Sequence, residues 1–132
     1  MLVKRLKDCR KFISGDGAVL RELLHSGKGD FKFRYSLAHA LVAPGKATRP
    51  HILKISEVYY IIKGSAIMNI GKESGRVSAG CAVYIPPGKI QYIRNTGRKT
   101  LEFLCIVDPA WRPKDEKVIP AVPEAAYRGT AL

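Results

Sequence analysis

The sequence predicts an all-β fold, a sandwich or a barrel, from three observations. Clusters of turn-forming residues, mostly Gly, Pro, Ser and Asn, recur at short intervals along the chain. The segments between these clusters are short and rich in Val, Ile, Leu, Tyr and Phe, which is the composition of β-strands. The length of 132 residues is that of one domain with one core. We therefore expect many short strands around a single apolar interior.

Each element can be placed between the turn clusters. Residues 2–12 form a basic arm that fits a short helix or an irregular segment. Residues 18–25 fit a helix or a strand equally by periodicity, and the glycine clusters that bound them on both sides favour a strand. Further strands are expected at residues 33–42, 58–62, 66–70, 82–85, 90–94 and 101–107.

The composition changes after Asp108. Residues 109–132 contain four prolines, which exclude further central strands because proline cannot donate a hydrogen bond to a sheet. We expect one domain over residues 1–132, with a barrel core over about residues 18–108 and a tail over residues 109–132 that lies on the barrel. Trp111 is expected to anchor this tail on the barrel surface, which is more common for such an aromatic residue than stacking on a ligand.

Charge, cysteines and apolar runs limit the partners and the compartment. The net charge is +12, but the basic residues are scattered singly along strand-like segments and no nucleic-acid-binding motif accompanies them, so nucleic acid is not the expected partner. No apolar run reaches the roughly 20 residues that span a bilayer, and the basic start lacks a signal-peptide core. Cys9, Cys81 and Cys105 are odd in number and far apart, as free thiols are. We expect a cytoplasmic protein.

Two spaced patterns carry the most specific information. The first reads Gly-x5-His-x-Leu-x3-Glu-x6-Gly and consists of Gly45, His51, Leu53, Glu57 and Gly64. The second reads Gly-x5-Pro-x-Gly-x2-Gln-x3-Asn and consists of Gly80, Pro86, Gly88, Gln91 and Asn95. Gly45 and Gly64 lie where a chain reversal needs a positive φ, and the Pro-Pro-Gly turn at residues 86–88 stops one strand and directs the next.

With these two patterns the sequence resembles the cupin superfamily, in particular the small single-domain barrels of cupin 2 type. The first cupin motif reads Gly-x5-His-x-His-x3-4-Glu-x6-Gly and the second Gly-x5-Pro-x-Gly-x2-His-x3-Asn. The resemblance covers Gly45 to Asn95, and the flanking strands extend it over most of the chain. It implies a double-sheet jelly roll, a β-barrel with a pocket in its mouth.

The resemblance also implies a degenerate metal site. In cupins the histidines and the glutamate of these motifs bind a divalent metal, and here only His51 and Glu57 match, because Leu53 and Gln91 occupy the other two histidine positions. Leucine cannot bind a metal, whereas the Gln91 amide oxygen is a weak ligand. The implied site is His51, Glu57 and Gln91 with Mn, Fe, Ni or Zn. The alternative is a buried His51–Glu57 pair without metal, and His39 is either a replacement ligand or, more commonly, a structural histidine.

Alternation along the strand at residues 58–62 adds one further candidate. Tyr59 shares the inward face with Glu57, so these two residues are the catalytic candidates, although Tyr59 can equally fill the barrel. Two functions follow from the resemblance. The first is a metal-dependent enzyme acting on a small anionic metabolite, by dioxygenation, decarboxylation or sugar isomerisation or epimerisation. The second is a non-catalytic module that binds a small molecule such as a sugar. A homodimer that covers the apolar strand at residues 58–62 is implied for both.

Overall fold

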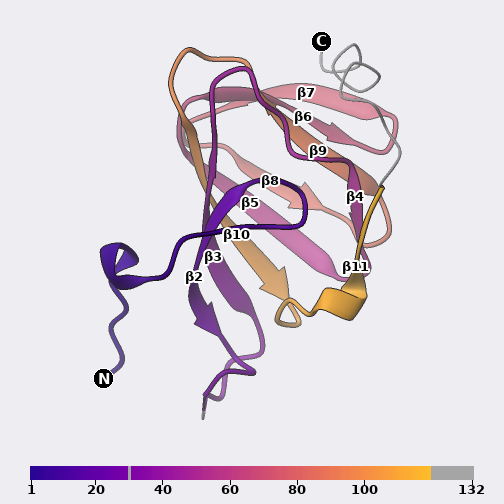
Figure 1. Ribbon diagram of the computed structural model, residues 1–132. Coiled ribbons are helices and arrows are strands. Elements are labelled where there is room, and N and C mark those ends of the chain that lie inside the picture. The colour runs from indigo at the N-terminus through magenta and orange to yellow at the C-terminus, as the bar shows by residue number, and fades with distance from the viewer. Residues whose placement is uncertain (30, 120–132) are drawn as a thin grey trace.

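The computed structural model describes residues 1–29 and 31–119, and its strands form two antiparallel sheets that face each other (Figure 1). The strands, in chain order, are β1 Phe12–Ile13, β2 Val19–His25, β3 Ser36–Val42, β4 His51–Leu53, β5 Ser56–Lys63, β6 Ser65–Ile70, β7 Glu73–Ser78, β8 Ala82–Ile85, β9 Ile90–Asn95, β10 Leu101–Asp108 and β11 Glu116–Val118. Two 3-10 turns, η1 Leu6–Asp8 and η2 Pro113–Asp115, complete the described elements.

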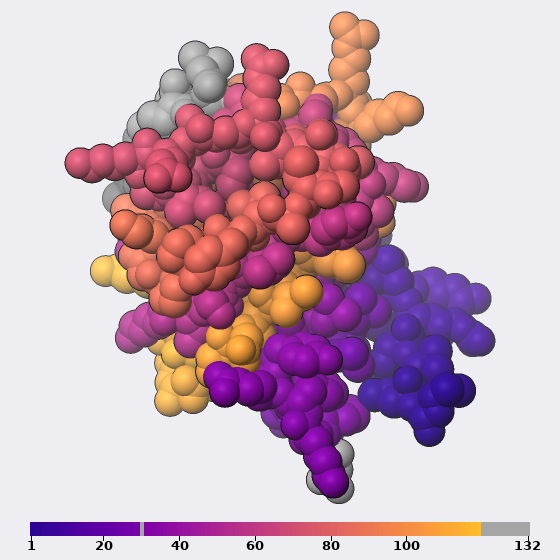
Figure 2. All heavy atoms as spheres, turned by 180° about the vertical axis from the view of Figure 1, so that it is seen from behind, coloured from indigo at the N-terminus to yellow at the C-terminus, as the bar shows by residue number. Residues whose placement is uncertain are grey.

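The strand order confirms the jelly-roll prediction. One sheet has six strands in the order β1-β2-β3-β10-β5-β8, and the other has five in the order β11-β4-β9-β6-β7. Consecutive strands repeatedly change sheet, as in a barrel made of two wound sheets. The N-terminal arm and the β2–β3 turn project from this barrel (Figure 2). No helix among the described residues is long and apolar enough to cross a membrane.

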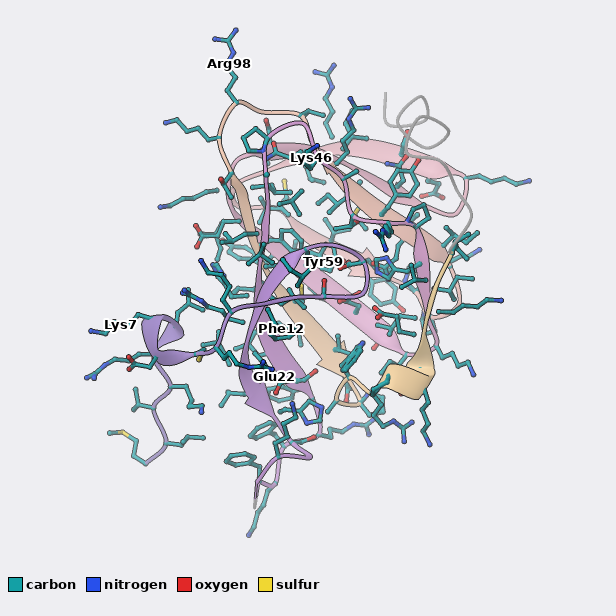
Figure 3. All side chains as sticks on the ribbon, in the orientation of Figure 1. Lys7, Phe12, Glu22, Lys46, Tyr59 and Arg98 are labelled. Atoms are coloured by element: carbon teal, nitrogen blue, oxygen red, sulfur yellow. The ribbon has the colours of Figure 1, made fainter. Side chains whose placement is uncertain are left out.

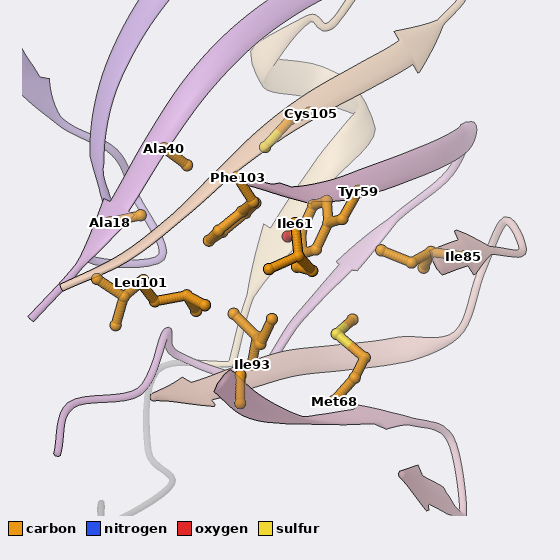
Figure 4. Packing of buried hydrophobic residues seen from close by; sticks show 12 residues of the cluster. Ala18, Ala40, Tyr59, Ile61, Met68, Ile85, Ile93, Leu101, Phe103 and Cys105 are labelled. Carbon is orange, nitrogen blue, oxygen red and sulfur yellow. The ribbon is translucent and has the colours of Figure 1, made fainter. Parts of the chain in front are cut away.

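The core lies between the two sheets and follows from strand alternation. On β10, the central strand of the larger sheet, the odd-numbered residues Leu101, Phe103, Cys105 and Val107 point inward and are buried. Ile93 of β9 and Met68 of β6 meet them from the other sheet (Figure 4). The Phe103 ring lies 4.6 Å from the Tyr59 ring, measured between centroids. The inward-facing side chains of the two sheets therefore form one continuous apolar cluster.

Both glycines of the first motif occupy the conformations that the sequence predicts. Gly45 has φ +74° and Gly64 has φ +98°, values in the left-handed region that favours glycine. At Gly64 a Cβ would also lie 3.3 Å from the Leu101 Cα, so the backbone of β10 passes close to this turn. The two glycines of the motif thus mark real chain reversals, Gly45 between β3 and β4 and Gly64 between β5 and β6.

Two segments at the ends of the chain extend the sheets beyond residues 18–108. Residues 18–25 contain the strand β2, as the bounding glycines predict, and the short strand β1 pairs with it from the arm. In the tail, β11 pairs with β4 and is an edge strand, which the tail prolines permit. The rest of the predicted tail, residues 120–132, lies outside the described residues.

Candidate functional site

A cavity of about 570 Å³ opens at the end of the barrel to which β1 and β11 contribute side chains. Its apolar wall comes mainly from the six-stranded sheet and includes Phe12, Leu20, Ala38, Ala40, Tyr59 and Phe103. Its titratable groups other than tyrosine and cysteine are Arg10, Asp16, Glu22, Lys28, His51, Glu57 and Glu116. Phe12, Glu22 and Tyr59, labelled in Figure 3, come from β1, β2 and β5 on this side of the molecule.

Glu57 is the carboxyl group most affected by this cavity. It occupies an inward position of β5 and is 8% exposed. The pKa of Glu57 is raised to about 8, mainly by burial and to a smaller extent by the negative charges of Asp16 and Glu116. The Gln91 side chain opposes these effects by interacting with the ionised carboxylate. At neutral pH the Glu57 carboxyl is therefore mostly protonated and can donate a hydrogen bond or a proton.

His51 faces the cavity in a defined tautomer. It begins β4, is 2% exposed, and its Nδ1 lies 2.7 Å from the backbone carbonyl oxygen of Arg49. Because a carbonyl oxygen only accepts, Nδ1 carries the proton and donates to it. The other ring nitrogen, Nε2, lies 3.7 Å from Oδ2 of Asp16. The imidazole is thus held by the backbone, and its Nε2 faces the carboxylate of Asp16.

Asp16 and Glu116 are the site residues that sequence reasoning missed. Asp16 lies in the turn between β1 and β2, where its Oδ1 accepts hydrogen bonds from the Ser14 hydroxyl and from the Ala18 amide. Glu116 begins β11, and burial raises its pKa while His51 and a hydrogen bond from Trp111 lower it. Neither position belongs to a motif, and only the pairing of β1 with β2 and of β11 with β4 brings them to the cavity.

Tyr59 and Gln91 form a buried polar pair beneath the cavity. The Tyr59 hydroxyl donates to Oε1 of Gln91 at 3.2 Å, and Gln91 is fully buried. The Gln91 amide nitrogen has no partner with normal hydrogen-bond geometry. Burial is the main cause that raises the pKa of Tyr59 well above its usual value. The Tyr59 hydroxyl is thus a neutral donor directed at Gln91, and its ring forms part of the cavity wall.

The side chains present do not fit a resident divalent metal. His51 and Gln91 face each other across β4 and β9, but the Gln91 oxygen already accepts from Tyr59. Leu53 is buried at the position where the cupin motif has its second histidine. Among residues 1–29 and 31–119, no three His, Cys, Asp or Glu side chains lie close enough together to hold one ion. The groups of the site that can take part in chemistry are therefore its side chains.

The structure also places three other residues that the sequence analysis considered, His39, Cys105 and Trp111, relative to the cavity. His39 lies on the outer side of the larger sheet, with Nε2 2.7 Å from the Glu102 carboxylate, and so does not reach the cavity. Cys105 lines the cavity, and burial raises the pKa of its thiol, which keeps it protonated. Trp111 also lines the cavity, so the expected tail anchor is part of the site wall.

Comparisons with known proteins agree with this architecture. The cupin domain family matches residues 38–107. The uncharacterized protein MJ1618 of Methanocaldococcus jannaschii is 35% identical over 113 residues, which cover 83% of this chain and 88% of that protein.

Two solved structures share the fold. The polyketide cyclase RemF from Streptomyces resistomycificus superimposes with a TM-score of 0.76 at 22% identity, over 98% of this chain and 92% of RemF. A predicted oxalate decarboxylase from Thermotoga maritima superimposes with a TM-score of 0.71 at 21% identity, over 80% of this chain and 97% of that one. The motif spacing, the two wound sheets and the family match agree, and the chain belongs to the cupin domain family.

Proposed function

We propose that this cupin is an enzyme that transfers protons to and from a small organic molecule held in the barrel cavity, with Glu57 and His51 as the acid–base pair. The observation that carries the proposal is the position of a buried carboxyl group, Glu57, in the wall of a cavity large enough for such a molecule. Perturbed titratable groups in a cavity of this kind are typical of catalytic sites.

The two groups support complementary proton transfers. Glu57, with a pKa of about 8, is a neutral acid at neutral pH and can protonate a substrate oxygen. When it carries no proton, His51 Nε2 can accept one from the substrate, and the Asp16 carboxylate at 3.7 Å would stabilise the imidazolium that forms. One group gives a proton while the other removes one, so the substrate is rearranged without net gain or loss of protons.

The names of the structural neighbours are compatible with this chemistry. RemF is a polyketide cyclase, and the Thermotoga maritima protein is a predicted oxalate decarboxylase. Both names describe reactions of organic molecules that carry carbonyl groups. Neither reaction is assigned to this chain, whose proposed activity depends on Glu57 and His51.

A chromogenic base probe tests the proposal before the substrate is known. In 5-nitrobenzisoxazole a base removes the ring C–H proton, the N–O bond breaks, and the nitrophenolate product absorbs visible light. The ionised form of Glu57 is a poorly solvated base, so we expect a rate that rises with pH with a midpoint near 8. The Glu57→Gln variant should lose the rate component with this midpoint, and any rate above the buffer background that remains should disappear in His51→Ala.

The Glu116→Gln variant is the matched control. It keeps the base and removes a neighbouring charge that raises the pKa of Glu57. We expect activity to persist and its pH midpoint to move to lower values. A rate that is unchanged in Glu57→Gln, or a wild-type rate equal to the background, would contradict the acid–base function.

A second candidate is a non-catalytic binding module, and Leu53 favours it. This residue is 2% exposed at a position where the cupin motif has a metal-binding histidine. A barrel that has lost this group can retain an apolar cavity for binding alone. In that case 5-nitrobenzisoxazole binds in the cavity but its N–O bond is not broken. Binding of the probe without formation of nitrophenolate would therefore identify a binding module and not an enzyme.

We also propose that two copies pair through the outer face of the larger sheet. Ile106, Val58 and Tyr84 lie side by side on β10, β5 and β8, and Tyr60 lies next to them. Ile106, Tyr60 and Tyr84 are 39%, 44% and 61% exposed. The charged outward residues of β10, Glu102 and Asp108, are paired with His39 and Arg34, so this face adds little charge repulsion between two strongly basic chains.

Light scattering at micromolar protein tests this pairing. We expect the mass of a dimer for the wild type and that of a monomer for Tyr84→Lys, because a lysine at the centre of a self-complementary apolar contact would be buried beside its own copy. A monomeric wild type would show that this face serves no second copy.

A further inference from the structure

We infer that the molecule bound in the cavity is flat, uncharged and unsaturated, such as a fused-ring phenol or ketone. This inference rests on the proposed function in one respect, since it names the class of molecule on which Glu57 would act. The shape and the apolarity of the walls support the first part, and the pairing of the charged side chains supports the second.

Small side chains line one wall of the cavity and leave space in front of it. Ala40 pairs with Leu20 and Phe103 on the neighbouring strands, and Ala38 pairs with Cys105 in the next inward row. All of these side chains line the cavity. Ala40 lies beside Phe103 and Cys105 in Figure 4. Because close-packed interiors leave few voids, a row of such small residues across two central strands creates space for the face of a ligand.

Aromatic side chains surround this space from several elements. Phe12 comes from β1, Tyr59 from β5, Phe103 from β10 and Trp111 from the segment after β10, and all four line the cavity. Tyr59 and Phe103 are already in tilted contact, with 41° between their ring planes. Aromatic pairs prefer offset stacked or edge-to-face contacts, so these walls favour a ring system over a flexible chain of equal volume.

The charges around the cavity already have partners within the chain. Asp16 accepts hydrogen bonds from Ser14 and Ala18, Glu22 pairs with Lys28 at 2.7 Å, and Glu116 accepts from Trp111. The Arg10 guanidinium lies 5.7 Å from the centroid of the Phe12 ring.

An anionic ligand would therefore enter a space that is lined by four carboxyl groups and whose arginine and lysine, Arg10 and Lys28, lie at exposed positions. A cationic ligand would compete with partners that the ionised carboxylates already have. The buried side chains of His51 and Glu57 remain as polar groups that can hydrogen-bond one polar atom of a neutral ligand. These conditions favour an uncharged molecule with a polar atom at one end.

Two fluorescent probes with the same ring system separate neutral from anionic ligands. N-phenyl-1-naphthylamine is uncharged, and 1-anilinonaphthalene-8-sulfonate adds one sulfonate to it. We expect the neutral probe to bind at least about tenfold more tightly, because an unpaired buried charge is costly. In competition, 2-naphthol should displace the neutral probe at about tenfold lower concentration than 1-decanol.

Cavity-filling substitutions locate the probe. Ala38→Leu and the milder Ala38→Val add side-chain volume to the wall, and we expect about a tenfold loss of affinity for the first and a smaller loss for the second. Ile90→Ala, at an exposed position of β9 that does not line the cavity, is the control and should bind as the wild type does. Circular dichroism establishes that each variant is folded, and the valine variant keeps the test valid if the leucine variant is not.

Each outcome decides the inference. Equal affinity for both probes, equal competition by decanol, or loss of binding in Ile90→Ala with none in the Ala38 variants would overturn it. The Glu57→Gln variant separates this test from that of the proposed function. It should retain probe affinity within about threefold, because the walls are intact and one hydrogen bond is modest, while the base activity due to Glu57 disappears. Probe binding without any wild-type base activity would refute the enzyme function and leave the ligand class standing.

Discussion

Replacing Glu57 with glutamine is expected to make the protein more stable than the wild type above pH 8, by up to about 5 kcal/mol. The Glu57 carboxyl has a pKa of about 8 in the folded protein, against 4.5 for an exposed glutamate. Above pH 4.5 the unfolded chain releases this proton, whereas the folded protein keeps it until about pH 8. Wild-type stability should therefore fall across this interval and level off above it.

Glutamine removes this dependence because it has no proton to release. It has nearly the same shape as the protonated carboxyl, so the two proteins should be similarly stable near pH 4.5 and diverge as the pH rises, by about 1.4 kcal/mol per pH unit at most. Asp16, His51 and Glu116, which face Glu57, are present in both proteins. The difference between the two curves thus isolates Glu57.

Urea unfolding at a series of pH values measures this difference. Glu73→Gln is the control, since it removes the same charge from an exposed position of β7, and its curve should run parallel to that of the wild type. Parallel curves for Glu57→Gln and the wild type would show that Glu57 is ionised in the folded protein at neutral pH. The acid function proposed for Glu57 would then be untenable.

The double variant Leu53→His, Gln91→His is expected to gain about one equivalent of a divalent metal, while the wild type retains far less. The substitutions complete the cupin motif around His51 and Glu57. They also remove the Gln91 oxygen that accepts from Tyr59 and the buried leucine that cannot bind a metal. Imidazole ligands favour Zn, Ni and Co, and a bound cation would stabilise the ionised form of Glu57.

Metal content by plasma mass spectrometry gives the primary result. A second measurement is the thermal midpoint, because a metal present at about 100 times its dissociation constant stabilises the folded state by about 2.7 kcal/mol. His51→Ala in the double variant should abolish both effects. If instead the wild type carries about one equivalent that His51→Ala removes, then His51, Glu57 and Gln91 form a metal site and the metal-free chemistry proposed here is wrong.

The sequence predicted the strands well where turn residues bounded them. The glycine clusters around residues 18–25 decided in favour of a strand when periodicity could not, because a helix there would have had almost no room for its caps. The strands β1, β4, β7 and β11 were not predicted. The edge strand β11 is the clearest case. Its three residues lie between prolines, and only the free edge of β4 gives them a partner.

The residues of the candidate site also fall into those that the sequence predicted and those that it left open. Alternation along β5 placed Glu57 and Tyr59 on one face, and the motif spacing placed His51 in the barrel, because both depend on positions close together in the chain. His39 was ambiguous because both faces of its strand are apolar. The structure resolves the ambiguity by pairing it with Glu102 on the outside.

By itself the sequence determined the all-β class and the inward position of Glu57, because turn residues and strand alternation are local, and its resemblance to the cupin motifs added the cupin fold and the absence of two motif histidines. Only the tertiary structure decided that Asp16, Trp111 and Glu116 line the same cavity as His51. Those residues come from the two ends of the chain, and only the pairing of distant strands brings them together. The raised pKa of Glu57 was likewise decided there, because its cause is burial among side chains that are remote in sequence.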